Sequence, residues 1–240
     1  VSGTHARRPG TAPSGTLLAE LHRDGTATLS DPIELPEMHG FGGLRNAISP
    51  YSVPAQHARF NLVNMPGIRT SAMRGLGTHL NVFAIESFID ELAARAKADP
   101  LDYRLSLLDD PRARAVLERV AKAAAWRERP TDGESGWGIA YSRYKNRAAY
   151  VAMVARVTVD EQVHVDKLWC CADAGRVVNM DGLRNQIEGG IVQSASWALF
   201  EEVRLTPESR LPETWEDYPI LRFPDLPEIV LDVVDSADPV

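Results

Sequence analysis

The chain has 240 residues, of which 44% are hydrophobic and 25% are charged, as in an ordinary globular protein. Its formal net charge of −7 argues against a nucleic-acid-binding protein, which would usually carry a basic surface. No apolar run reaches the roughly 20 residues that cross a bilayer, and the N-terminal residues lack the apolar core of a signal peptide. We therefore expect a cytoplasmic location, or a periplasmic one if an export signal lies upstream of Val1.

Residues 1–50 are predicted to be an extended N-terminal segment. Asp24-Gly25, set between apolar residues, is typical of a hairpin turn. Further on, prolines interrupt the chain and leave one strand at about residues 58–63. We expect this extended chain to lie against one larger domain, residues 51–240.

Three helices are predicted between about residues 80 and 125. Residues 80–98 repeat apolar side chains at three- and four-residue spacing. Pro100 and Pro111 each follow an aspartate, the usual order of an N-cap and a first helical residue. Short links predict that the three helices pack as a layer. The carboxylates on the predicted helices, Glu86 among them, are interpreted as solvent-exposed.

Strands are predicted over about residues 137–172, where the apolar period changes to two. Residues 149–173 indicate two antiparallel strands around a turn at 160–162. Cys170 and Cys171 are neighbours and would form a strained disulfide, so we interpret them as buried apolar residues. A last strand is expected at 228–234. Helices and strands come in runs, which indicates an α+β fold with mixed or antiparallel sheets packed against helices.

The stretch "RNQIEGGIVQSASWALFEE" predicts a helix over about residues 183–202, yet Gly189 and Gly190 lie in its middle. A glycine inside a helix costs roughly 0.5–1 kcal/mol relative to alanine. Gln186, Gly190 and Gln193 share one helical face, where a flat group could meet bare backbone and two amides. A close crossing with another helix or a sheet explains the glycines equally well.

Standard catalytic motifs are absent from the sequence. The six histidines are scattered, so no metal ligands are predicted. The sequence contains neither a G-x-S-x-G nucleophile elbow nor a Walker-type lysine loop. Asp173 follows a strand and is interpreted as a turn cap.

Three long motifs carry a family resemblance. They are "AMRGLGTHLNVFAIESFIDELAARAKADPLDYRLSLL", "LRNQIEGGIVQSASWALFEEV" and "YPILRFPDLPEI". In this order they resemble the molybdopterin-binding large subunit of the xanthine dehydrogenase and aldehyde oxidase family. They are most similar to the bacterial branch with isoquinoline 1-oxidoreductase and nicotinate dehydrogenase. The resemblance runs from about Tyr51 to the end of the chain.

The resemblance implies a set of cofactor-binding residues. Gln186 matches the glutamine that hydrogen-bonds the pyranopterin, and Gly189 and Gly190 leave room for that group. The R-G-x-G loop near the molybdenum centre matches residues 74–77. Leu76 stands in this loop at a position where relatives often have a bulkier residue. The cofactor-binding residues implied are Gln186, Gly189, Gly190, Arg74, Gly75 and Gly77.

The implied reaction hydroxylates an aldehyde or an N-heteroaromatic carbon with oxygen derived from water. The molybdenum cofactor, molybdopterin, would be bound in a full assembly with the remaining molybdopterin-subunit polypeptide, and an iron–sulfur subunit would accept the electrons. In relatives, a G-V-G-E glutamate that acts as general base follows soon after the segment that ends here at Val240. We therefore expect a part of a molybdenum hydroxylase that is inactive alone, and we assign no catalytic residue to the chain.

Two other hypotheses stay open. The first is a folded, non-catalytic fragment or assembly module that binds no cofactor alone. The second is a binding module that holds a heteroaromatic ligand without turnover. Because a partial domain would expose apolar surface, we also expect a homo-oligomer or a tightly bound partner chain.

Overall fold

The computed structural model describes residues 42–58, 73–131, 133–205, 210–211 and 214–239. The chain divides into two compact units. One comprises Val1–Asp99 with Tyr144–Arg147, and the other comprises Pro100–Arg143 with Ala148–Val240. The hairpin predicted at Asp24-Gly25 lies outside the described residues, as does nearly all of the strand predicted at 58–63. The domain boundary predicted after residue 50 stays a prediction.

The first unit contains the 3-10 helix η1, Gly42–Leu44, and the long helix α2, Thr78–Arg95. α2 begins two residues before the predicted start, and its buried apolar residues are Ile89, which lies on the predicted apolar stripe, and Ala93, which does not. The prediction for Glu86 was wrong, because this side chain is buried and its Oε1 accepts a hydrogen bond of 2.9 Å from the buried Tyr51 hydroxyl. A buried carboxylate of this kind requires such a donor.

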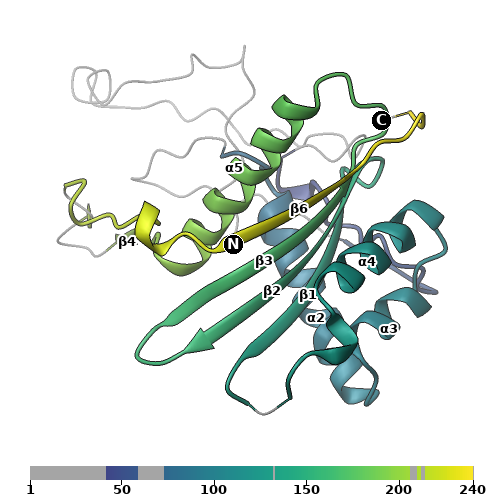
Figure 1. Cartoon of the computed structure of the whole chain (residues 1–240), viewed down its shortest axis with the longest axis horizontal. Coiled ribbons are helices and arrows are strands. Elements are labelled where there is room, and N and C mark those ends of the chain that lie inside the picture. The colour runs from purple at the N-terminus through teal and green to yellow at the C-terminus, as the bar shows by residue number, and fades with distance from the viewer. Residues whose placement is uncertain (1–41, 59–72, 132, 206–209, 212–213, 240) are drawn as a thin grey trace. The chain divides into compact units, whose positions relative to one another are not determined.

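The second unit is built on a four-stranded sheet with the order β1-β2-β3-β6 (Figure 1). Its strands are β1 Gly136–Tyr144, β2 Ala148–Val159, β3 Val163–Asp173 and β6 Glu228–Val234. β2 and β3 are antiparallel and β3 and β6 are parallel, so the sheet is mixed. A separate antiparallel pair is formed by β4 Arg204–Leu205 and β5 Arg210–Leu211. The predicted α+β class is confirmed.

The helices of the second unit are α3 Pro100–Ser106, α4 Pro111–Ala123 and α5 Met180–Leu199, with the 3-10 helices η2 Trp126–Glu128 and η3 Phe223–Asp225. α4 begins as its sequence predicts, because Asp110 Oδ1 accepts a 2.9 Å hydrogen bond from the Arg112 amide. The three predicted helices form, but α2 belongs to the first unit and α3 and α4 to the second.

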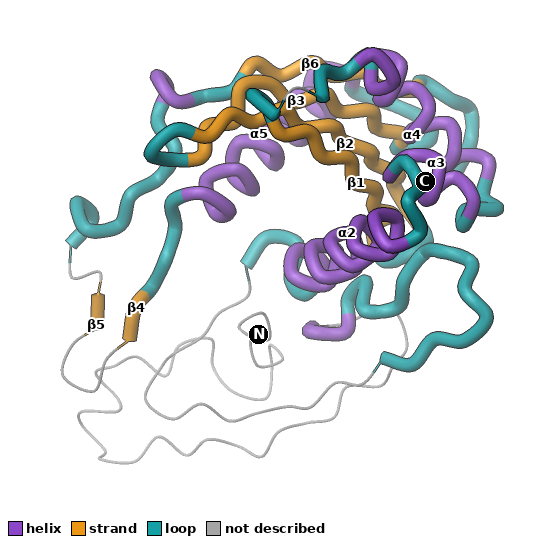
Figure 2. The backbone as a smooth tube through the Cα atoms, turned by 90° about the horizontal axis from the view of Figure 1, so that it is seen from below, coloured by secondary structure: helices purple, strands orange, loops and turns teal. Residues whose placement is uncertain are grey.

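The sheet is covered on both faces, by α4 on one and by α5 on the other (Figures 1 and 2). Side chains alternate along a strand, so Cys170 and Cys171 of β3 point to opposite faces. Leu168 and Cys170 pack with Ile191 of α5. On the other face, α4 packs against β2 and β3. Its buried side chains are Ala113, Val116, Leu117, Val120 and Ala121.

The predicted burial of both cysteines is confirmed. No helix in the described part of the chain is long and apolar enough to cross a membrane.

Candidate functional site

α5 carries half of the predicted site residues, and its N-terminus is well fixed. Asn179 caps the helix, with its Oδ1 accepting a 2.8 Å hydrogen bond from the Gly182 amide. Asp181 lies in the first turn, where a negative charge is favourable beside the helix dipole. The helix then continues without a break through Gly189 and Gly190.

The two sides of α5 have different surroundings. Ile187 and Ile191 pack against the sheet. Gln186 and Gly189 are exposed, and Gly190 is half-buried. A Cβ atom built on Gly189 meets no heavy atom within 4 Å among the residues that the structure describes. A close crossing by another described helix or strand therefore does not explain why glycine stands at position 189, which lies on an open part of the helix surface.

The other predicted site residues form the turn that leads into α2. Leu76 N donates to Met73 O at 3.0 Å, and Thr78 N donates to Gly75 O at 3.1 Å. Gly75 has a φ of +83°, a conformation that glycine adopts without steric penalty. Leu76 follows with a φ of +53°, which is uncommon for a residue with a side chain. Arg74 is exposed at the start of this turn.

The predicted residues thus fall into two groups of neighbours. Gln186, Gly189 and Gly190 belong to the second unit, and residues 74–77 belong to the first. Within each group, the residues lie together as their sequence spacing indicates.

An ion-pair network that the sequence analysis missed holds the connection between β3 and α5. Asp173 ends β3, and its carboxylate accepts hydrogen bonds from Arg112 Nε at 2.8 Å and Arg112 Nη2 at 2.7 Å. It also accepts from the Gly175 amide at 2.9 Å, as a turn cap does. The paired guanidinium holds the pKa of Asp173 below its usual value, although burial opposes this shift. The ion-pair partners are 61 residues apart, so no local motif indicates the pair.

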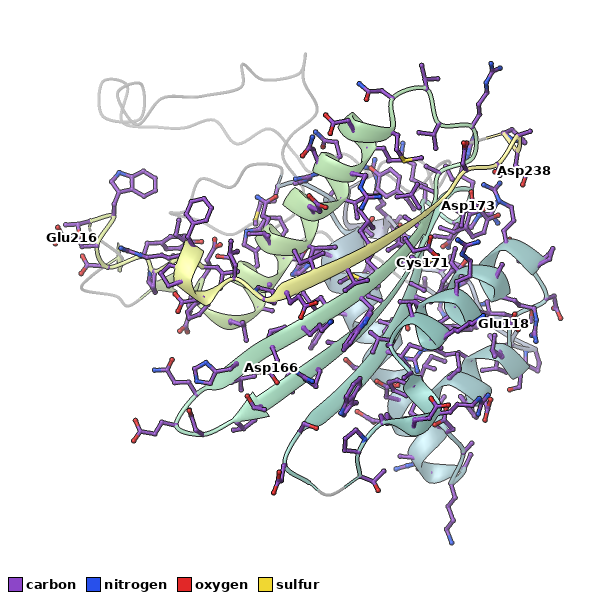
Figure 3. All side chains as sticks on the ribbon, in the orientation of Figure 1. Glu118, Asp166, Cys171, Asp173, Glu216 and Asp238 are labelled. Atoms are coloured by element: carbon purple, nitrogen blue, oxygen red, sulfur yellow. The ribbon has the colours of Figure 1, made fainter. Side chains whose placement is uncertain are left out.

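The same connection lies against residues 238–239. Arg176 N donates to Asp238 O at 3.0 Å, and Arg112 Nη1 donates to Pro239 O at 3.1 Å. Gly175 has a φ of +72°, and a Cβ atom there would lie 2.6 Å from Asp238 O. Figure 3 shows Asp173 and Asp238 at the same end of the sheet. The backbone that leads into α5 is therefore fixed by close packing as well as by charge.

A second ion pair joins α4 to the last strand. Arg119 Nε and Nη2 each donate to the Asp232 carboxylate at 2.8 Å. This interaction lowers the pKa of Asp232 and raises that of Arg119. Burial raises the pKa of Cys170 and Cys171 to about 12, which disfavours the reactive thiolate form of both. Over the described residues, no three His, Cys, Asp or Glu side chains gather as a metal site would require.

Comparison with known families assigns this architecture. Residues 67–227, more than half of the chain, match the sequence model of a molybdopterin cofactor-binding domain. A second molybdopterin cofactor-binding domain model matches residues 22–107. The chain belongs to the molybdopterin cofactor-binding domain family. The family resemblance read from the sequence motifs is confirmed.

Individual relatives agree with this assignment. The chain is 40% identical over 205 residues to a nicotinate dehydrogenase subunit of Pseudomonas putida. It is 36% identical over 192 residues to the beta subunit of isoquinoline 1-oxidoreductase of Brevundimonas diminuta. Each match covers 78% of this chain, but the chain spans only 17% and 24% of those relatives. Among solved structures, quinoline 2-oxidoreductase from Pseudomonas putida 86 is 27% identical, with a TM-score of 0.35, over 37% of this chain and 12% of that one.

The open surface of α5 suits a pterin. A pterin presents hydrogen-bond donors and acceptors along the edge of a flat ring, and the Gln186 amide offers both kinds of group. Gly189 has open space where a side chain would otherwise project. These features of this chain fit the cofactor that its family is named for.

Proposed function

We propose that this chain forms one wall of the molybdopterin pocket of a molybdenum hydroxylase. The proposal is supported by membership of the molybdopterin cofactor-binding domain family. The observation that carries it is the open surface at Gly189 beside the exposed Gln186, in a helix whose opposite side is packed on the sheet. Glycine destabilises a helix, yet α5 has Gly189 at a position where no described neighbour requires a glycine. This is expected when another molecule occupies that surface.

Each proposed residue has a distinct part in binding. Gln186 would donate to and accept from the pterin edge, while Gly189 and Gly190 would let the ring approach the helix backbone. Arg74, Gly75 and Gly77 would form a second contact, in which the guanidinium suits an anionic group of the cofactor. When bound, the molybdenum centre would supply oxidation of the substrate carbon with oxygen derived from water. The residues of this chain bind and orient the cofactor, and none is assigned a catalytic role.

We further propose that the substrate is an N-heteroaromatic compound. Nicotinate and isoquinoline, the compounds in the names of the two relatives that are 40% and 36% identical, are both nitrogen heterocycles. The proposed partners are the remaining molybdopterin-subunit polypeptide and an iron–sulfur subunit. Trp215 and Phe223 are each 90% exposed, and aromatic side chains are enriched in protein–protein interfaces, which supports the proposal of a partner.

The experiment measures molybdenum content and released pterin fluorescence on protein purified from its native host. We expect molybdenum near one atom per chain and a marked loss of both signals in Gln186→Ala. Gln162→Ala is the matched control, because Gln162 lies in the turn between β2 and β3. Equal cofactor content in both variants would refute the role of Gln186. A folded protein without molybdenum or pterin would instead support the non-catalytic assembly module.

A further inference from the structure

A polar network surrounds the buried side chain of Asn46 in the first unit. Its side-chain Oδ1 accepts hydrogen bonds from Thr78 Oγ1 at 2.9 Å and from Lys145 N at 3.0 Å. Its Nδ2 donates to Asn146 Oδ1 at 3.0 Å. Asn46 is only 5% exposed and has a φ of +60°, a conformation that asparagine tolerates better than most residues. This one amide therefore joins the 43–46 segment, the start of α2 and the tip of the β1–β2 hairpin.

The hairpin tip has the backbone geometry that this network needs. Lys145 and Asn146 have φ values of +56° and +55°, as both central residues of a type I′ turn do. Arg147 N closes the turn on Tyr144 O at 3.2 Å. The nearly buried Arg45 donates to the Tyr144 hydroxyl at 2.5 Å. These hydrogen bonds hold the tip in the conformation that presents the Lys145 amide and the Asn146 side chain to Asn46.

The network reaches the turn at residues 74–77 through α2. Thr78, which follows Gly77 directly, is the first residue of this helix. One turn later, Asn81 Nδ2 donates to Gly43 O at 2.7 Å and to Arg45 O at 2.8 Å. The first turn of α2 is therefore fastened to the 43–46 segment at two positions. This attachment fixes the end of a turn whose residue Leu76 has an unfavourable positive φ.

We propose that Asn46 is a positioning residue that holds the Arg74–Gly77 turn in its cofactor-binding conformation. Asn46 acts through the Thr78 hydroxyl, and the tip of the hairpin supports it from the other side. The part of this inference that concerns cofactor binding rests on the proposed function. The part that concerns the conformation of the turn does not, and hydrogen exchange tests it independently of the cofactor.

The test uses Thr78 because Asn46→Ala would remove three partly buried hydrogen bonds at once and could prevent folding. Thr78→Val removes the hydroxyl at nearly constant shape, and Thr78→Ser restores it. Thr158→Val is the matched control, since Thr158 Oγ1 donates to Asp166 Oδ1 at 3.0 Å in the other unit. Amide hydrogen exchange is measured on the 240-residue chain, and pterin content on protein from the native host.

We expect the Leu76 and Thr78 amides to exchange about three- to tenfold faster in Thr78→Val, with parent-like rates in Thr78→Ser and Thr158→Val. Pterin content should fall in Thr78→Val and recover in Thr78→Ser. Unchanged exchange in Thr78→Val, or equally fast exchange in Thr78→Ser, would overturn the role of Asn46. Faster exchange with unchanged pterin content would overturn its link to the cofactor. A parent protein without pterin would refute the proposed function, while exchange would still decide the role of Asn46.

Discussion

Replacing Gly189 with alanine should stabilise the protein while weakening cofactor retention. Gly189 lies inside α5, where alanine is favoured over glycine by about 0.5–1 kcal/mol. The added Cβ atom meets no described heavy atom within 4 Å, so no packing penalty offsets this gain. The same methyl group would project from the surface on which we place the pterin. The free energy of unfolding and the cofactor content should therefore change in opposite directions.

The assay is urea unfolding of the 240-residue chain followed by circular dichroism, together with the pterin measurement on native-host protein. We expect the free energy of unfolding to rise by about 0.5–1 kcal/mol, which for this size raises Tm by about 1–4 °C. Gly182→Ala in the same helix is the control, because its Cβ atom would lie 3.1 Å from Asn179 Nδ2 and press on the helix cap. That change should give no gain. A destabilised Gly189→Ala protein would refute the reasoning, because it would mean that Gly189 is tightly packed.

Two further predictions concern the ion pair at the end of β3 and the cysteines. Asp173→Asn should lower the free energy of unfolding by about 2–4 kcal/mol at pH 7, because the half-buried Arg112 loses the carboxylate of the buried Asp173. The pKa of Asp173 is lowered in the folded protein, so this stabilisation is complete above about pH 5 and is lost as the pH falls through the folded pKa. The parent protein and Asp173→Asn should therefore become equally stable in acid. A constant difference between them down to about pH 2 in urea titrations would contradict the ion-pair explanation. Burial raises the pKa of Cys170 and Cys171 to about 12, so neither thiol should react with a thiol reagent at about pH 8 until the protein unfolds. Rapid reaction of the native protein would show that the α4 or α5 face of the sheet opens.

Much of the local structure follows from local spacing. Asp110-Pro111 predicts the start of α4, and the alternation over residues 149–173 predicts β2 and β3, because capping and side-chain direction depend on residues a few positions apart. The helix predicted at 183–202 lies at Met180–Leu199, since the Asn179 cap is one turn upstream of the motif. Glu86 was misjudged because Tyr51, which buries it and donates to it, lies 35 residues away.

For the candidate site, the sequence by itself determined the family and the two groups of residues, because long motifs keep their residues adjacent along a helix or a turn. Only the tertiary structure decided that Gly189 lies on an open surface, since a glycine looks the same in sequence whether a neighbour or empty space faces it. It also revealed the pairs Arg112–Asp173 and Arg119–Asp232 and the network around Asn46. These interactions join residues 32 to 113 positions apart, and such contacts exist only after folding brings them together.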